Sequence, residues 1–131
     1  MGLRKILVIE DSELLQTMYR IGLRRFMDRG AEVIQAFNGL EALRVLEQNP
    51  DTDLIILDLV MPIMDGREFL RRWLEDPEHN KTPIIVISTE EAGERTYAGT
   101  NGTVVAHMTK PIKINELFAL IESIDRDTIH S

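Results

Sequence analysis

The stretch DLIILDLVMPIMDG, from Asp53 to Gly66, decides the fold and points to a site. Five of the six residues from Leu54 to Leu59 are apolar, and the sixth is Asp58. A near-continuous apolar run of this kind is typical of a strand that is buried on both faces of a parallel sheet. A carboxylate at its end is costly to bury unless it is paired, hydrogen-bonded or bound to a cation. The role of Asp58 therefore depends on which other residues reach it.

The composition favours one compact domain and argues against several classes of protein. The chain has 131 residues, 44% of them hydrophobic, and a net charge of −7, which suits a single core and disfavours nucleic acid or anionic membranes as partners. There is no cysteine, and the three histidines lack the spacing of a zinc site. No apolar stretch reaches the roughly 18 residues of a membrane span, and the opening residues do not form a signal peptide. We expect a cytoplasmic protein.

Short β-branched runs alternate with stretches of helical period along the whole chain. The expected strands cover residues 3–10, 31–37, 53–58, 83–88 and 103–108. This alternation implies right-handed crossovers and a parallel sheet with helices on both faces. We therefore predict an α/β fold with a doubly wound, five-stranded parallel sheet. Residues 1–131 form one domain, with its core at about 3–125 and a short C-terminal tail at 126–131.

The expected helices differ in how clearly the sequence marks them. The first begins after Ser12 as N-cap and carries an apolar stripe of Leu14, Leu15, Met18 and Ile21; a later one, at about 65–75, carries Phe69, Leu70, Trp73 and Leu74. We interpret both stripes as core. A last amphipathic helix covers 114–124. The segment 89–102 contains three glycines, each costing about 1 kcal/mol inside a helix, so we expect at most two turns at 90–98 and a mobile remainder.

Polar residues stand at corresponding places along the chain, where the strands end. Glu10 and Asp11 follow the first strand, Asp58 ends the third, Ser88 ends the fourth, and Lys110 follows the fifth. In a parallel sheet all carboxyl ends lie at one edge, which is where ligands of open α/β sheets bind. These five side chains should therefore converge.

Three carboxylates at one edge would repel one another. Two unit charges 4 Å apart cost about 4 kcal/mol at an effective dielectric constant of 20, which raised pKa values, Lys110 or a divalent cation must offset. An oxygen-only site of this kind suits Mg²⁺ or Mn²⁺. A carboxylate can attack phosphorus to form an acyl phosphate, and Lys110 and Ser88 could then bind two of the phosphoryl oxygens.

Together these motifs resemble the receiver domain of two-component response regulators. The resemblance covers about residues 3–125 and rests on the acid pair Glu10-Asp11, LIILDLVMPIMDG around Asp58, PIIVIST with Ser88, and TKP with Lys110. It implies a flavodoxin-like sheet with the strand order 2-1-3-4-5.

The resemblance also implies a role for each residue. Asp58 would be the phosphoacceptor, Ser88 the switch hydroxyl and Lys110 the family's invariant lysine, followed by a peptide bond to Pro111 that is typically cis. The implied Mg²⁺ ligands are the side chains of Glu10, Asp11 and Asp58 and the backbone carbonyl of Val60.

Two positions depart from the family pattern. His107 stands where receivers commonly carry a switching Tyr or Phe, and it is either a pH-sensitive switch or a half-exposed strand residue. Thr89 stands where Ala or Gly is usual, so its bulk could hinder the hydrolytic water and prolong the phosphorylated state. The glycine-rich segment 89–102 also puts the usual output face of the family in doubt.

Each site residue also has an ordinary structural interpretation. Glu10 and Asp11 could cap a helix, Asp58 could form a turn, Ser88 could be a strand-end hydroxyl, and Lys110 could be a solvated loop charge. Their coincidence at matching strand ends favours the site.

Three classes of function follow. The first is a stand-alone receiver, which accepts a phosphoryl group on Asp58 from a histidine kinase or histidine phosphotransfer protein and signals to an unknown downstream protein, with homodimerisation as one route. The second is a metal-dependent phosphohydrolase; Val60, where such enzymes place a general acid Asp, counts against it. The third is a degenerate receiver that only binds partners.

Overall fold

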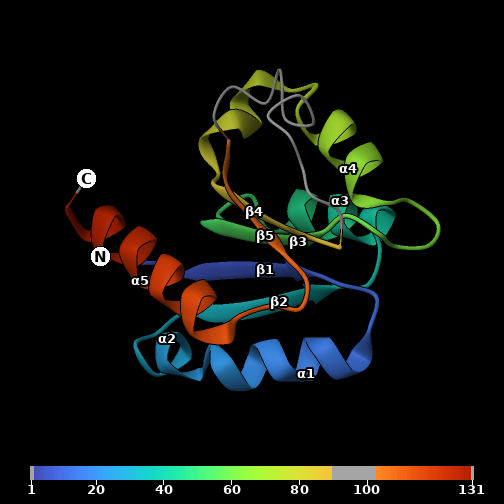
Figure 1. Ribbon diagram of the computed structural model, residues 1–131. Helices are drawn as coiled ribbons and strands as arrows, with labels where there is room; N and C mark the ends of the chain where they lie inside the picture. The colour runs from blue at the N-terminus through green and yellow to red at the C-terminus, as the bar shows by residue number, and fades with distance from the viewer. Residues whose placement is uncertain (1, 90–102, 131) are drawn as a thin grey trace.

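The computed structural model describes residues 2–89 and 103–130. Within these ranges the chain forms a parallel sheet of five strands in the order β2-β1-β3-β4-β5 (Figure 1). The strands are β1 Lys5–Ile9, β2 Glu32–Ala36, β3 Leu54–Asp58, β4 Ile84–Ser88 and β5 Val104–Thr109. Both the predicted fold class and the strand order implied by the family resemblance are confirmed.

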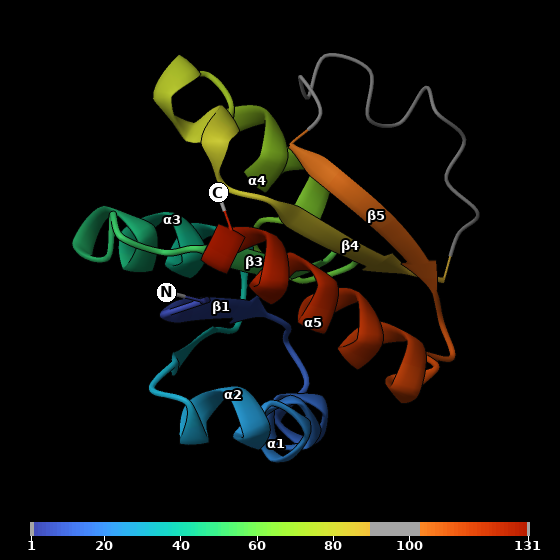
Figure 2. The ribbon, with the colours of Figure 1, turned by 90° about the vertical axis from the view of Figure 1, so that its left-hand side faces the viewer.

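Helices cover both faces of the sheet (Figures 1 and 2). One face carries α1 Glu13–Gly22, α2 Arg24–Asp28 and α5 Ile114–His130, and the other carries α3 Gly39–Gln48 and α4 Gly66–Trp73, followed by the 3₁₀ helix η1 Pro77–Lys81. None of the helices that the structure describes is long and apolar enough to cross a membrane. The helical turns expected at 90–98, and the mobility expected for most of 89–102, fall outside the described residues.

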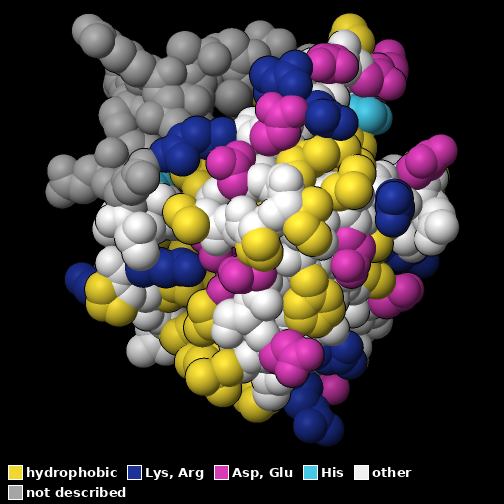
Figure 3. All heavy atoms as spheres, turned by 90° about the vertical axis from the view of Figure 1, so that its right-hand side faces the viewer, with side chains coloured by type: hydrophobic (Ala, Val, Ile, Leu, Met, Phe, Trp, Pro, Cys, Tyr) yellow, Lys and Arg dark blue, Asp and Glu magenta, His cyan; other side chains and the backbone are white. Residues whose placement is uncertain are grey.

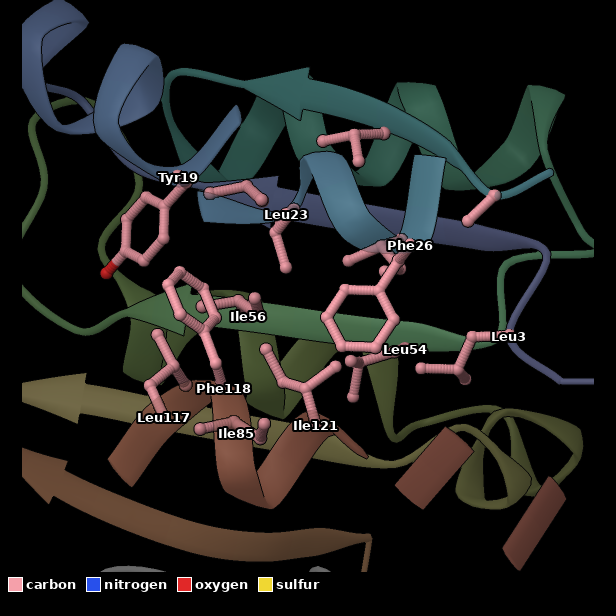
Figure 4. Packing of buried hydrophobic residues seen from close by; sticks show 14 of the residues in the cluster. Leu3, Tyr19, Leu23, Phe26, Leu54, Ile56, Ile85, Leu117, Phe118 and Ile121 are labelled. Atoms are coloured by element: carbon pink, nitrogen blue, oxygen red, sulfur yellow. The ribbon is translucent and has the colours of Figure 1, made fainter. Parts of the chain in front are cut away.

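Alternate residues of the central strand supply the two halves of the core. Leu54 and Ile56 point toward α2 and α5 (Figure 4), whereas Ile55 and Leu57 pack with α3 and α4. All four are at most 1% exposed, and burying each side chain contributes about 1.5–3 kcal/mol. This packing fixes the register of β3, and so fixes where Asp58 emerges from the sheet.

The predicted burial of the first apolar stripe is wrong for three of its four residues, and only Leu15 packs partly against the core. Leu14 and Ile21 are each 70% exposed and Met18 is 44% exposed, whereas Gln16 and Tyr19 are buried. The reason lies in α5: a Cβ atom at position 22 would collide with the ring of Phe118, so α5 packs on the side of α1 that carries Gly22. The 14-18-21 stripe therefore faces outward. In α4 the predicted stripe is buried at three of its residues, Phe69, Leu70 and Trp73.

The last helix is longer than predicted. It continues through His130 rather than ending at Ile124, so the predicted tail is helical over 126–130. Asp125 explains the extension, because its carboxylate is buried and accepts a hydrogen bond of 2.6 Å from the Leu3 N–H. This contact fastens the end of α5 to the beginning of β1.

Candidate functional site

The carboxyl ends of the strands bring the predicted polar residues to one edge of the sheet. Figure 3 looks onto this edge and shows acidic side chains set among hydrophobic ones. Glu10, Asp11 and Asp58, the acidic cluster, each offer one oxygen, and these oxygens all lie within 4.8 Å of one another. Glu10 and Asp58 are buried and Asp11 is exposed. The convergence predicted from the strand ends is confirmed for these three residues.

Both oxygens of the Asp58 carboxylate are held. Oδ1 accepts a hydrogen bond from the Val60 N–H at 3.1 Å, and Oδ2 accepts one from Lys110 Nζ, also at 3.1 Å. Lys110 is placed by the sheet, because its own N–H donates to the Ser88 carbonyl at 2.8 Å. The Lys110-Pro111 peptide bond is cis, as the family resemblance implied. One ammonium thus faces three carboxylates, and the cluster carries excess negative charge.

Protonation of Glu10 relieves part of that charge. Burial, followed by the hydrogen bond with Asp58 and the charge of Asp58, raises the pKa of Glu10 to about 9. Without a cation, Glu10 therefore holds a proton at neutral pH. Burial and the charges of Glu10 and Asp58 also raise the pKa of the Tyr19 hydroxyl, which keeps Tyr19 neutral.

The acidic cluster fits a divalent cation. Glu10 Oε2 is buried and has no hydrogen-bond partner within residues 2–89 and 103–130. An unpartnered buried oxygen beside two more carboxylates is what a hard cation such as Mg²⁺ or Mn²⁺ would satisfy. A set of ligands that are all carboxylate oxygens also suits Mg²⁺ or Mn²⁺.

Sequence reasoning missed Gln16, which positions the end of β1. Its buried side-chain amide donates to the backbone carbonyls of Val8, Glu10 and Ala36, each at 3.0 Å. These bonds connect the backbone of Glu10, at the end of β1, to both α1 and β2. The available signal was a polar residue three positions before Tyr19, on the same face of the helix.

Gly66 is a second residue whose importance the sequence did not reveal. A Cβ atom there would lie 2.6 Å from Leu59 Cα and 2.7 Å from the Asp58 carbonyl oxygen. Without a side chain, the Gly66 N–H reaches the Leu59 carbonyl at 2.8 Å. This contact folds the loop between β3 and α4 back against the end of β3, directly beside Asp58.

The remaining predicted residues reach the same edge in different degrees. Ser88 is fully buried and lies one residue beyond Ile87, the partner of Asp58 in the β3–β4 register. Thr89 is exposed, and His107 is half-buried in β5, where it pairs with Val86. The switch role of His107, the access role of Thr89 and the ligand role of the Val60 carbonyl stay predictions.

Comparisons with known proteins agree on one family. Residues 6–122 match the model of the family described as "Response regulator receiver domain". The chain is 31% identical over 126 residues to the chemotaxis protein CheY1 of Helicobacter pylori, covering 92% of this chain and 99% of that protein. The structure resembles that of chemotaxis protein CheY4 of Vibrio cholerae, with a TM-score of 0.76, 29% identity, and coverage of 94% and 99%.

A third comparison concerns the phosphorylated cyanobacterial phytochrome response regulator RcpA. The TM-score to its crystal structure is 0.73 at 27% identity, and the match covers 98% of this chain and 95% of that one. Several other curated relatives are transcriptional regulators, and the chain spans about half of the length of these.

Proposed function

Because the chain belongs to the response regulator receiver family, we propose that it is a phosphorylation-dependent switch whose acceptor is Asp58. The family consists of signalling domains rather than conventional enzymes. The observation that carries the proposal is the Asp58 carboxylate itself. It is 5% exposed, held by the Val60 N–H and Lys110, and set beside two further carboxylates at the sheet edge.

The reaction is a transfer from a phosphohistidine of a histidine kinase or phosphotransfer protein. A bond forms between phosphorus and one Asp58 carboxylate oxygen while the phosphorus–nitrogen bond of the donor breaks. The electron pair of that bond stays with the imidazole nitrogen, which takes up a proton. Such transfer depends mainly on positioning and on neutralising the phosphoryl oxygens.

The residues around Asp58 divide this work. Lys110 Nζ already lies 3.1 Å from the Asp58 carboxylate. After the transfer, its ammonium can pair with a negatively charged phosphoryl oxygen. Gln16 and the Gly66 contact keep the end of β1 and the loop after β3 in place. Rigid positioning of this kind is what phosphoryl transfer requires.

A divalent cation completes the proposed site. The side chains of Glu10, Asp11 and Asp58 and the Val60 carbonyl would hold Mg²⁺ or Mn²⁺. When bound, the cation supplies the positive charge that neutralises the incoming phosphoryl oxygens. Glu10 would have to lose its proton for its unpartnered oxygen to serve as a ligand.

The output of the switch runs through the other strand ends. The Ser88 hydroxyl donates a hydrogen bond to the phosphoryl group, His107 responds from the neighbouring strand, and Thr89 limits the approach of water. A downstream protein, or a second copy of this chain, then recognises the altered surface.

Two rivals are less well supported. A metal-dependent phosphohydrolase lacks its general acid, because Val60 occupies that position. A degenerate receiver that only binds partners would not need the acidic cluster, Ser88 and Lys110 together, although it remains the alternative against which the experiment is designed.

Intact-mass spectrometry after incubation with acetyl phosphate and Mg²⁺ tests the proposal. We expect one phosphoryl adduct on the wild type, none on Asp58→Asn, and none on the wild type when the metal is chelated. Asp65→Asn is the matched control: it changes an exposed carboxyl of the same loop, and asparagine caps α4 equally well, so its adduct should persist.

The contrary outcome is also specific. If neither acetyl phosphate nor any phosphohistidine protein modifies the wild type, Asp58 is not an acceptor and the binding-only alternative holds. An adduct that survives in Asp58→Asn would place the acceptor elsewhere.

A further inference from the structure

The loop between β3 and α4 contains a strained turn close to Asp58. Ile63 has a φ angle of +68°, and the Met64 N–H donates to the Pro62 carbonyl at 2.7 Å. Together these describe a γ-turn of the positive-φ kind, which is rare and strained. For a β-branched residue, a positive φ is an outlier. Within residues 2–89 and 103–130, Ile63 is the only residue other than glycine with this conformation.

The surrounding structure imposes the shape of the turn. Met61 and Met64, on either side of it, are both buried in the core beneath α3 and α4. The Met64 carbonyl accepts a hydrogen bond of 2.9 Å from the Gly39 N–H, and the Gly66 N–H donates to Leu59. Both ends of the turn are therefore fixed, which is how strained backbone persists in folded proteins. The fold therefore requires a positive φ at position 63, but it does not require an apolar side chain there.

The side chain at this position is unfavourable in two respects. Glycine or asparagine would adopt the positive φ with less strain. Ile63 is also 80% exposed, which is the highest value among the large hydrophobic residues of the described chain. An apolar side chain that is both strained and exposed gains little from the domain itself. Strain beside a site is grounds for a functional hypothesis, and exposed apolar surface marks contacts with partners.

We infer that Ile63 is a docking residue for the protein that donates the phosphoryl group. The strained turn holds an apolar side chain outward, where it meets apolar surface surrounding the phosphohistidine of that donor. This inference rests on the proposed acceptor role of Asp58, and it names a residue that distinguishes protein donors from small-molecule donors.

The position of the loop favours the donor over other partners. Val60, which is 55% exposed, holds Asp58 Oδ1 through its N–H, and Ile63 lies three residues further along the same loop. A donor must bring its phosphorus within bonding distance of an Asp58 oxygen, so a protein donor must contact the loops that surround Asp58, and this loop is one of them. Apolar contact there also excludes water and strengthens the electrostatic interactions of the site. A downstream protein that recognises the phosphorylated state has no such geometric requirement.

The test compares two classes of donor on matched variants. Acetyl phosphate is the small donor; the protein donors are purified phosphohistidine proteins of the source organism, radiolabelled on phosphorus. Ile63→Asn removes the apolar surface and relaxes the turn, whereas Ile63→Leu keeps the apolar surface. Val105→Asn is the control, because Val105 is also an exposed apolar residue, 48% exposed, but lies near the beginning of β5, away from the edge where the strands end.

We expect opposite changes in stability and in protein-dependent labelling. Ile63→Asn should melt about 3 °C or more above the wild type, because it relieves backbone strain. Its labelling by the protein donor should fall about tenfold, in keeping with the loss of one large apolar contact, while labelling by acetyl phosphate should change less than about twofold because the acceptor is untouched. Ile63→Leu and Val105→Asn should both keep the protein-dependent rate.

Three outcomes would overturn the inference. The first is that the protein donor labels Ile63→Asn as fast as the wild type. The second is that Ile63→Asn loses both kinds of labelling equally, which would place the effect in the acceptor site. The third is that no protein donor labels the wild type faster than acetyl phosphate does. If acetyl phosphate and protein donors both fail to label the wild type, it is the proposed function that fails.

Discussion

Two buried carboxylates of this protein are held in nearly the same way, yet only one belongs to the candidate site. Asp58 and Asp125 are each 5% exposed. Asp58 accepts hydrogen bonds from the Val60 N–H and Lys110, and Asp125 accepts them from the Leu3 N–H at 2.6 Å and from Arg29 at 3.2 Å. Burial and pairing therefore do not separate a functional carboxylate from a structural one.

The difference lies in what surrounds each pair. Asp125 shares Arg29 with Glu122, which lies 2.7 Å from the guanidinium, so two carboxylates meet one cation. At Asp58 three carboxyl groups meet one ammonium, Glu10 holds a proton as a result, and one buried oxygen of Glu10 has no partner among the residues described. A third carboxyl group with a raised pKa and an unsatisfied buried oxygen are features of a site that binds a ligand. Asp125 instead has a structural role, because it joins the end of α5 to the beginning of β1.

The largest expected effect concerns pH and Glu10. In the metal-free protein the pKa of Glu10 is raised from 4.5 to about 9, so between these values the folded state holds a proton that the unfolded state has lost. Stability should therefore be greatest below pH 4.5 as far as Glu10 is concerned, and should fall as pH rises toward 9, by at most about 1.4 kcal/mol per pH unit. Glu10→Gln should remove this slope.

Urea denaturation in the presence of a chelator, from pH 5 to pH 9, measures the slope directly. Glu13→Gln, at an exposed position of α1, is the control and should leave the slope unchanged. An unaltered slope in Glu10→Gln would show that the acidic cluster is not the source of the pH dependence, and the contrast with Asp125 would weaken.

The next effect concerns Asp125 and the closing of the fold. Asp125→Ala should destabilise the protein by about 2–3 kcal/mol, because it leaves the buried Leu3 N–H without its acceptor and removes one of the two carboxylate partners of Arg29. Urea denaturation measures the loss, and Asp127→Ala, at an exposed position of the same helix, should change stability by less than about 0.5 kcal/mol. Equal losses in both variants would mean that the buried contacts of Asp125 contribute no more to the free energy of unfolding than an exposed side chain does.

The smallest effect concerns the cation and separates the two carboxylates most sharply. Mg²⁺ at ten times its dissociation constant should stabilise the wild type by about 1.4 kcal/mol relative to chelator. Asp125→Asn should keep this gain and Asp58→Asn should lose most of it, because only Asp58 belongs to the acidic cluster. Thermal melting with and without Mg²⁺ measures both variants. A gain that survives in Asp58→Asn would exclude Asp58 from the cation site.

Sequence reasoning succeeded where a property depends on neighbours along the chain. The apolar runs marked all five strands to within two residues at each end, and Ser12 caps α1 as predicted. The convergence of Glu10, Asp11 and Asp58 followed from the single rule that parallel strands end at one edge. The strand order came from the family resemblance and not from these patterns.

The same reasoning failed where burial depends on distant residues. The stripes of α1 and α4 have the same kind of apolar periodicity, yet Leu14 and Ile21 face outward while Phe69 and Trp73 face the core. Periodicity identifies a stripe, but α5, almost 100 residues away in sequence, decides which side of α1 is covered. The length of α5 was missed for a similar reason, because Asp125 is fixed by a contact with Leu3.

The sequence by itself determined the strands, their alternation with helices, and the placing of acids and a lysine at the strand ends, since these follow from local periodicity and from the geometry of a parallel sheet. Only the tertiary structure decided that Glu10 holds a proton, that the Gln16 amide fixes the end of β1, that the apolar stripe of α1 faces outward, and that Ile63 points outward from its turn. Each of these depends on which groups lie within a few ångströms in space, and the loss of water around them sets the energies.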